Sequence, residues 1–581
     1  MIPGCARIAS VFLCFAAVFG CKSTGPRLTP EQIAIRTDLE KIEPREYACA
    51  RESPILDIHT HTFNARYLPL RGILEGKRDA FPPLTWLISD DCAATLAHAL
   101  VERTELASAA GQKGVNRVEL ASQSHNHRDG GFICRIFLGL LDKAATKGAW
   151  QKGMSSEAQL DAIDKVAEEM NLMERTAVMT ATHMMGMEHE VDMSTNGLRG
   201  AVRFLWLLTQ SDAHLPGLFR MQLEGPPMLG KPLMVSHMMD LAPVYNQMPD
   251  AQSPDELLDF EEKQLPRMAE FQSRPDSNLI YFVAYNPYRD HWGRDSGRSG
   301  SLELVEKAIE ENGAWGVKVY PPSGYRPSGN AIRNRPSGIR SRIAAQQYDA
   351  RYGPLPGDKN KALDQKLRKL LEWCIKNDRP VFVHAGTGEF EAQKGYGFYH
   401  SDPAFWQEFL KDHPTLRLCL GHAGGADLWF GGKKATKWGE AVYQMCRTYP
   451  NVYCEITTHA ELVSPDKQAY FVDQLARKFK ETENGAGPYE FSKKLIYGSD
   501  WYLPDASERA TVLLAAQKAW LHGSIRKHYR DYFFGNALRY LNVEKRLKEP
   551  GHRAAPIDDR LREALTLAEA TEDGPCTVAN R

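Results

Sequence analysis

The chain has 581 residues, of which 43% are hydrophobic and 25% charged, so it is long enough for one large domain with an insertion or an appendage. Its 72 Lys and Arg residues nearly balance its 73 Asp and Glu residues, and the formal net charge is −1. This balance excludes the basic footprint of a nucleic-acid-binding protein and gives no bulk attraction to an anionic membrane surface.

The first 20 residues have the pattern of an export signal. Arg7 places a positive charge ahead of an apolar stretch, Ile8 to Phe19, which is too short to span a bilayer comfortably. The stretch ends at Gly20-Cys21 and resembles a bacterial lipoprotein signal, in which Cys21 carries the lipid. A plain secretory signal with a chance cysteine is the alternative. Both interpretations predict export, and the first predicts a lipid anchor in the bacterial cell envelope, facing the periplasm or the outside, with residues 21–52 as tether and N-terminal segment.

The cysteines beyond Cys21 show no CxxC spacing, so the sequence predicts no structural zinc site made of cysteines. Export would permit disulfides, and Cys49, Cys92 and Cys134 are candidate partners whose pairing the sequence does not determine. Cys419 and Cys454 lie in apolar, strand-like runs and are expected in the core.

From Ser53 onward, short apolar runs that end in polar residues alternate with helical segments. Eight runs are candidate strands: residues 55–59, 231–241, 279–284, 316–320, 381–384, 416–422, 452–456 and 495–500. Amphipathic segments such as Lys361 to Asn377 and Pro403 to Asp412 separate several of them. The pattern predicts an α/β fold, a distorted (β/α)8 TIM-type barrel over residues 53–545. An open doubly wound sheet is the rival, but no Gly-x-Gly-x-x-Gly sequence follows any of the strands.

Residues from about 75 to 230 are expected to form a long, mainly helical insertion after the first strand, because one crossover helix needs far fewer residues. Residues 176–185 are a competing candidate for the second strand. Residues 546–581 are expected to form a loose C-terminal tail with a short helix at 560–570.

His59 and His61 are the first candidates for a metal site. Alternation along a strand places them on the same face as Asp57, at the end of a barrel strand where active sites form. A His-x-His pair is weak evidence alone, since such pairs also occur by chance.

Later strand ends strengthen this interpretation. His384 ends the fifth strand, His422 the sixth and Asp500 the eighth. Each residue alone could be explained by hydrogen-bonded packing or a turn. Five ligand-type side chains that converge on one rim instead favour a metal site.

These motifs resemble the amidohydrolase superfamily and, more narrowly, its amidohydrolase-related branch of decarboxylases and lactonases. The resemblance covers about residues 53–95 and 230–545 and rests on Asp57 to His61, Val383 to Gly386, Gly421 to Gly425 and Tyr497 to Trp501, with support from Gly316 to Pro322 and Gly535 to Leu541. It implies that one divalent metal ion, most simply Zn²⁺, is bound by His59, His61, His384 and Asp500.

The resemblance also implies roles in catalysis. Metal-activated water would be the nucleophile, Asp500 would move its proton to the leaving group, and His422 would polarise the scissile carbonyl. In binuclear members His422 binds a second metal and a lysine of the fourth strand, here Lys318, is carboxylated. A cationic Lys318 that binds a substrate carboxylate or an internal aspartate is the alternative that we prefer. Glu455 is expected to be a structural hydrogen-bond acceptor.

Loops after the strands supply candidates for substrate binding, namely Arg289, Tyr320, Arg326 and Trp501. The two arginines could clamp an anionic group bidentately, although solvation is the default for a single surface arginine. His183 and His237 are placed outside the site.

The sequence therefore predicts a hydrolase that acts on a C–N or C–O bond (amide, ester or lactone) of a small molecule, which could be anionic. Non-oxidative decarboxylation of a carboxylated substrate is one alternative. A binding lipoprotein without turnover is another, although a pure binder would not need the full ligand set. We expect no nucleic-acid partner and contact with membranes only through the lipid anchor. Substrate, number of metals and oligomeric state stay undetermined.

Overall fold

The computed structural model describes residues 53–62, 64–67, 96–100, 104, 132–147, 156–171, 174–175, 178, 195–211, 214–224, 231–241, 259–289, 299–330, 357–386, 396–431, 437–457, 460–501, 515–521, 524–549 and 555–569. The export signal, Cys21, Cys49 and Cys92 lie outside this part of the chain, as does the side chain of Cys134. The lipid anchor and the disulfides therefore stay predictions.

Eight parallel strands form one sheet in the order of the chain, from β1 to β8. Their bounds are Pro54–Thr60 (β1), Lys231–His237 (β2), Leu279–Tyr285 (β3), Gly316–Val319 (β4), Val381–His384 (β5), Leu418–Gly421 (β6), Val452–Thr457 (β7) and Leu495–Gly498 (β8). An isolated parallel bridge between Thr60 and Trp501 brings the last strand back to the first. The predicted distorted (β/α)8 barrel is confirmed.

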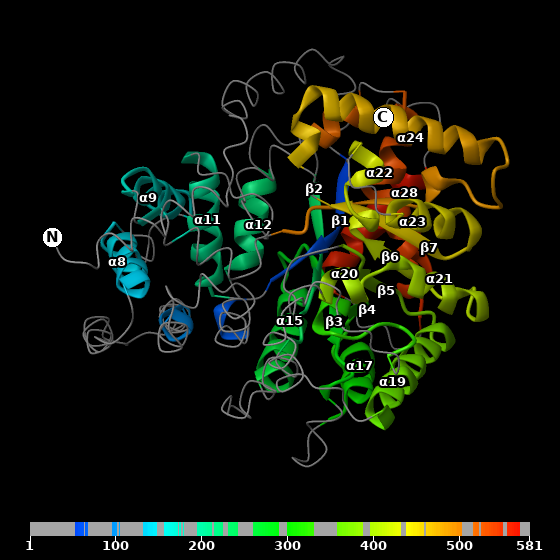
Figure 1. Ribbon diagram of the computed structural model, residues 1–581, viewed down its shortest axis with the longest axis horizontal. Helices are drawn as coiled ribbons and strands as arrows, with labels where there is room; N and C mark the ends of the chain where they lie inside the picture. Colours follow the sequence, from blue (N-terminus) through cyan, green and yellow to red (C-terminus); the bar gives the residue numbers. More distant parts are fainter. Residues whose placement is uncertain are drawn as a thin grey trace, which may run out of the picture.

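Helices surround this sheet (Figure 1). After β2 they are α15 (Leu265–Gln272), α17 (Ser301–Glu310), α19 (Gly357–Lys376), α20 (Tyr396–His400), α21 (Pro403–Asp412), α22 (Asp427–Phe430), α23 (Trp438–Thr448), α24 (Pro465–Glu483), α26 (Asn536–Leu541), α27 (Val543–Arg546) and α28 (Ile557–Glu569). Within the described residues, no helix is both long and apolar enough to cross a bilayer.

Local sequence explains where individual helices begin and which face they bury. The Asp402 side chain accepts a hydrogen bond from Ala404 N at 2.9 Å, and Pro403 takes the first position of α21. On α19, Leu363, Leu367 and Leu370 recur at helical spacing and are fully buried. Both helices fall on the segments that the sequence predicts.

The residues between β1 and β2 add a helical unit beside the barrel (Figure 1). Its described helices are α8 (Phe132–Thr146), α9 (Ser156–Glu168), α11 (Thr195–Leu208) and α12 (Leu215–Glu224). The second strand is Lys231–His237, paired with β1 and β3. Of the competing segment 176–185 only Val178 is described, and it is helical.

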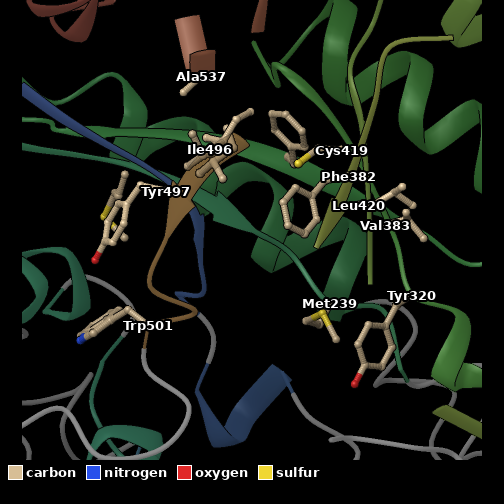
Figure 2. Close-up of a cluster of buried hydrophobic side chains, with 14 of the residues drawn as sticks. Met239, Tyr320, Phe382, Val383, Cys419, Leu420, Ile496, Tyr497, Trp501 and Ala537 are labelled. Carbon is tan, nitrogen blue, oxygen red and sulfur yellow. The ribbon is translucent and has the colours of Figure 1, made fainter. Parts of the chain in front are cut away.

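Aromatic and small side chains fill the barrel below the strand ends. The register places Lys318, Phe382 and Cys419 side by side on adjacent strands. Figure 2 shows Phe382, Cys419 and Ile496 grouped together. A Cβ on Gly421 would lie 2.7 Å from Phe382 Cε1, so only glycine leaves room for this ring. Cys419 and Cys454 are buried as expected.

The C-terminal segment packs onto the same core. On α28, Ile557, Leu561 and Ala564 are fully buried, so this part of the predicted tail is folded against the domain. At the start of α26, the fully buried Asn536 donates hydrogen bonds from Nδ2 to Ser492 O at 2.8 Å and to Leu495 O at 2.7 Å. It thereby holds the beginning of β8.

Replacing Asn536 with alanine is expected to lower the free energy of unfolding by about 2–3 kcal/mol, because two buried carbonyls lose their donor. Chemical denaturation measures this difference. Lys548→Ala, which removes an exposed i,i+4 pair with Glu544, is the control and should change the free energy by less than about 0.5 kcal/mol. Equal effects of the two substitutions would contradict the anchoring role.

Lys494 predicts a pH dependence of stability. Burial lowers its pKa to about 8, and its ammonium lies 4.7 Å from the ring centre of Tyr453. Between pH 8 and the ordinary lysine pKa of about 10.5, the unfolded chain binds more protons than the folded one. The free energy of unfolding of the wild type should therefore rise by up to about 3 kcal/mol relative to Lys494→Met across this range, and the difference should be constant below pH 8. Parallel pH profiles would contradict the lowered pKa.

Candidate metal centre

The carboxyl ends of the strands bring histidines and one aspartate together. His59, His422 and Asp500 each offer a ligand atom, and these atoms all lie within 4.8 Å of one another. His59 is on β1, His422 follows β6 and Asp500 follows β8. All three are buried, with exposed fractions of 1%, 8% and 2%. The cluster could hold a metal ion.

The two histidines of the His-x-His pair turn the same ring edge toward Asp500. His59 Nε2 lies 3.4 Å and His61 Nε2 3.3 Å from Asp500 Oδ1. The register between β1 and β2 shifts between Asp57 and Thr60, an irregularity that re-aims side chains at this end of the strand. The ring nitrogens of the pair and the carboxylate that follows the eighth strand therefore lie within contact distance of one another.

The opposite ring edges are held by hydrogen-bond acceptors. His61 Nδ1 lies 2.9 Å from the carbonyl oxygen of His237, which can only accept, so this nitrogen carries the proton. In a neutral ring Nε2 then has a free electron pair that faces the Asp500 carboxylate. A cation between these two electron-rich atoms would stabilise their contact, and metal-binding histidines are commonly oriented in this way.

Burial keeps these rings neutral. It lowers the pKa of His59 well below the ordinary value, and the nearby Lys318 ammonium lowers the pKa further. Burial also lowers the pKa of His61, against the opposing effect of Asp500, and that of His237. Neutral imidazole is the form that binds metal ions.

The carboxylates make the centre anionic. Asp57, Glu455 and Asp500 are each at most 2% exposed, and Lys318 at 1% exposed is the buried ammonium beside His59. With all four groups charged and the histidines neutral, three negative charges and one positive charge leave a net charge of −2. Burial raises the pKa of Glu455, and the nearby Asp500 and Asp57 raise it further, which reflects this crowding of negative charge. A divalent cation would neutralise it, so the donor set fits such an ion.

Two of the cluster residues have left-handed backbone conformations. His422 has φ 61° and Asp500 has φ 53°, which is unfavourable for residues other than glycine. Hydrogen bonds hold them: His422 N donates to Glu455 Oε2 at 3.2 Å, and Ser499 N, next to Asp500, donates to Asp57 Oδ1 at 2.9 Å. Strain of this kind persists where the surroundings impose it and is typical of functional sites.

His384 joins the cluster through a hydrogen bond. Its Nδ1 lies 2.9 Å from His422 Nε2, and its ring packs edge-to-face with Tyr320 at 5.1 Å. The three-residue group contains His422 and not His384, whereas the sequence assigns His384 to the ligand set and His422 to catalysis. The division of roles between the two stays a prediction.

Lys318 lies against His59. Its Nζ is 3.1 Å from His59 Nε2 and 4.5 Å from the ring centre of Phe382. The sequence predicts a lysine of the fourth strand near the candidate ligands, and in the structure Lys318 lies beside one of them. Carboxylation and a cationic role both stay open.

The substrate-binding candidates have different surroundings. Trp501 is 1% exposed and packs against Phe219 of α12 at 5.3 Å. Arg289 is buried and forms two 2.8 Å hydrogen bonds to the Asp240 carboxylate, which it would have to exchange for a substrate anion. The Arg326 guanidinium lies 4.4 Å from the ring centre of Phe405. Their roles in binding substrate stay predictions.

His237, which the sequence predicts outside the site, packs against the cluster. It is fully buried, its ring lies edge-to-face on His59 at 5.3 Å, and its Nε2 is 2.7 Å from Ile58 O. The sequence contains a pattern that could have indicated this position, since His237 ends the second strand as His384 ends the fifth. A lone strand-end histidine is nevertheless ambiguous without its neighbours.

Comparison with known proteins agrees with this arrangement. Residues 298–542 match the amidohydrolase family model. The matched region contains Lys318, His384, His422 and Asp500, whereas His59 and His61 lie before it. A search of curated proteins finds no match.

Several solved structures, among them the following three, have low similarity to this chain. One is a 2,6-dihydroxybenzoate decarboxylase in complex with 2,6-dihydroxybenzoate, with 14% identity over 56% of this chain and 87% of that chain and a TM-score of 0.30. Another is the 5-carboxyvanillate decarboxylase of Sphingomonas paucimobilis, with 12% identity over 54% and 78% and a TM-score of 0.29. The third is an amidohydrolase of Burkholderia multivorans with bound HEPES, with 14% identity over 50% and 88% and a TM-score of 0.26. Likenesses this weak carry no argument about the reaction.

The cluster predicts that the purified protein binds a divalent metal and that His59→Ala lowers the affinity at least about 10-fold, because one imidazole donor is lost. Elemental analysis after dialysis and titration of the metal-free protein measure both. His413→Ala is the control, since that imidazole stacks on Phe409 of α21 and should leave the affinity unchanged. Undiminished binding by His59→Ala would remove His59 from the ligand set.

Proposed function

We propose that this protein is a metal-dependent hydrolase that cleaves a C–N or C–O bond of a small molecule. The observation that carries the proposal is the buried cluster of His59, His422 and Asp500, with His61 Nε2 turned toward the same carboxylate. It lies at the carboxyl end of a parallel barrel, where active sites of this architecture form. The amidohydrolase match of residues 298–542 supports the same chemistry.

The ligands are proposed to be His59, His61 and Asp500, with either His384 or His422 completing the set. A divalent ion, most simply Zn²⁺, would supply a Lewis acid and bring the pKa of water toward neutrality. The histidine and carboxylate donors suit this ion.

The side chains of this protein are then proposed to have separate catalytic roles. Asp500 is the proposed proton acceptor, because its carboxylate lies at the meeting point of the His59 and His61 rings. With His384 as the fourth ligand, His422, which is 8% exposed against 1% for His59, is proposed to donate a hydrogen bond to the oxygen that gains charge. The buried surroundings exclude bulk water and strengthen both interactions.

Non-oxidative decarboxylation is the second candidate, and Lys318 favours it. A buried ammonium 3.1 Å from His59 Nε2 is placed to bind a carboxylate of the substrate next to the metal ligands. Both reactions would use the same cluster and differ in the bond that breaks.

Removal of the metal with a chelator is expected to abolish turnover of esters, lactones, amides and aromatic carboxylates in a substrate panel, and Zn²⁺ should restore it. Asp500→Asn is expected to lower kcat at least about 100-fold, because the proton acceptor is lost. Asp473→Asn, on the exposed face of α24, is the matched control.

Release of carbon dioxide, scored beside acid release on the same panel, separates the two reactions. Full activity in the metal-free protein would contradict both. Metal binding without turnover of any substrate would instead favour the binding lipoprotein.

A further inference from the structure

Glu455 contacts two residues of the metal cluster at once. It lies on β7 and is fully buried. Its Oε2 is 3.1 Å from His59 Nδ1 and 3.2 Å from the backbone nitrogen of His422. One carboxylate oxygen therefore joins a ring on β1 to the main chain that follows β6.

The contact with His59 determines which ring nitrogen carries the proton. Lys318 Nζ, 3.1 Å from His59 Nε2, is a donor in its charged form, so Nε2 is the acceptor there. The proton of a neutral ring must then be on Nδ1, which donates it to Glu455 Oε2. The electron pair on Nε2 then lies near both Lys318 and Asp500. A metal ligand requires this tautomer, and a bound ion would take the place of the lysine hydrogen bond.

The contact with His422 acts on the main chain. His422 has φ 61° and is followed by Ala423 with φ 45°, two consecutive left-handed residues without glycine's freedom. The hydrogen bond from His422 N to Glu455 stabilises this conformation, which places the His422 ring 5.2 Å from that of His59. Loss of the acceptor would let the segment relax toward an ordinary conformation.

The neighbouring strand is shaped to fit this carboxyl group. A Cβ on Gly498 of β8 would lie 2.7 Å from Glu455 Cγ, Cδ and Oε1. Real Cβ atoms do not approach so closely, so any side chain at Gly498 would displace Glu455 from its two donors. A glycine at position 498 therefore leaves the space that the Glu455 carboxyl group occupies beside the metal cluster.

We propose that Glu455 is a positioning residue that sets the His59 tautomer and the His422 backbone, and thereby the affinity and geometry of the metal centre. The proposal rests on the metal-binding role above. Glu455 does not itself take part in the reaction, because its contacts are to the back of one ligand and to the main chain of another residue.

The test measures the affinity of the metal-free full-length protein for Zn²⁺ and the visible absorption of its Co²⁺ form. Glu455→Ala is expected to weaken Zn²⁺ binding about 10- to 100-fold and to change the Co²⁺ spectrum. Glu455→Gln should retain more affinity, because its amide oxygen can still accept from both N–H groups. Glu455→Met, which fills similar space without an oxygen acceptor, should bind as weakly as Glu455→Ala, whereas a merely space-filling role would leave its affinity near that of the wild type.

Gly498→Ala is a second variant, which keeps the glutamate at position 455 in the sequence. It should reproduce the weaker binding and altered spectrum by moving the carboxyl group, and with Glu455→Gln it decides the matter if Glu455→Ala does not fold. Asn536→Ala is the control, because it costs stability at the opposite end of β8 and should keep the wild-type affinity and spectrum.

The outcomes separate the two proposals. A wild-type protein that takes up neither Zn²⁺ nor Co²⁺ overturns the proposed function. A wild type that binds both, together with Glu455 and Gly498 variants of unchanged affinity and spectrum, overturns only the positioning role. Equal losses in Glu455→Ala and Glu455→Gln would also overturn it, since a retained acceptor would then have no effect.

Discussion

The Asp57 carboxylate joins the first strand of the barrel to the last, and the centre depends on this junction. Asp57 is fully buried, and its Oδ1 accepts hydrogen bonds from His59 N at 3.2 Å and from Ser499 N at 2.9 Å. The sheet is continuous from β1 to β8, but between β8 and β1 the described strand pairing is a single bridge. A buried acceptor shared by two backbone donors is costly to disrupt, so it fixes the His-x-His pair beside Asp500.

The helical unit between β1 and β2 also stabilises the junction of β1 and β8. Phe219 of α12 packs on the Trp501 ring, and the Trp501 carbonyl accepts a hydrogen bond from His61 N at 2.5 Å. Asn64, just past the His-x-His pair, donates to Gln210 O at 3.1 Å at the end of α11. An insertion that would otherwise be peripheral thus packs on the residues that follow the candidate ligands of both strands.

Burial of so many ionisable groups is unfavourable unless each finds a partner. Here the groups form hydrogen bonds with one another across strands. The Glu455 carboxylate accepts from the His59 ring and from the His422 backbone N–H, and the His237 carbonyl accepts from the His61 ring. The remaining donor atoms face a common point near Asp500, and their excess negative charge matches a divalent ion. The low dielectric that makes these groups costly also strengthens their hold on such an ion.

The sequence by itself determined the architecture and most of the candidate ligands. Apolar runs of strand length alternate with amphipathic helices, and this pattern needs no knowledge of distant contacts. Parallel strands share a polarity, so residues at their carboxyl ends must meet at one rim, which is why His59, His384, His422 and Asp500 could be grouped in advance.

The tertiary structure decided which atoms of these residues meet and what holds them. His59 and Glu455 are 396 positions apart, and no local pattern shows that one oxygen would serve both His59 and His422. The contacts of His237 and the Arg289–Asp240 ion pair could not be predicted from the sequence for the same reason. A strand-end histidine or a loop arginine has many possible partners. Periodicity is a property of neighbouring residues, whereas tautomers, ion pairs and strained backbone depend on contacts that only the closed barrel creates.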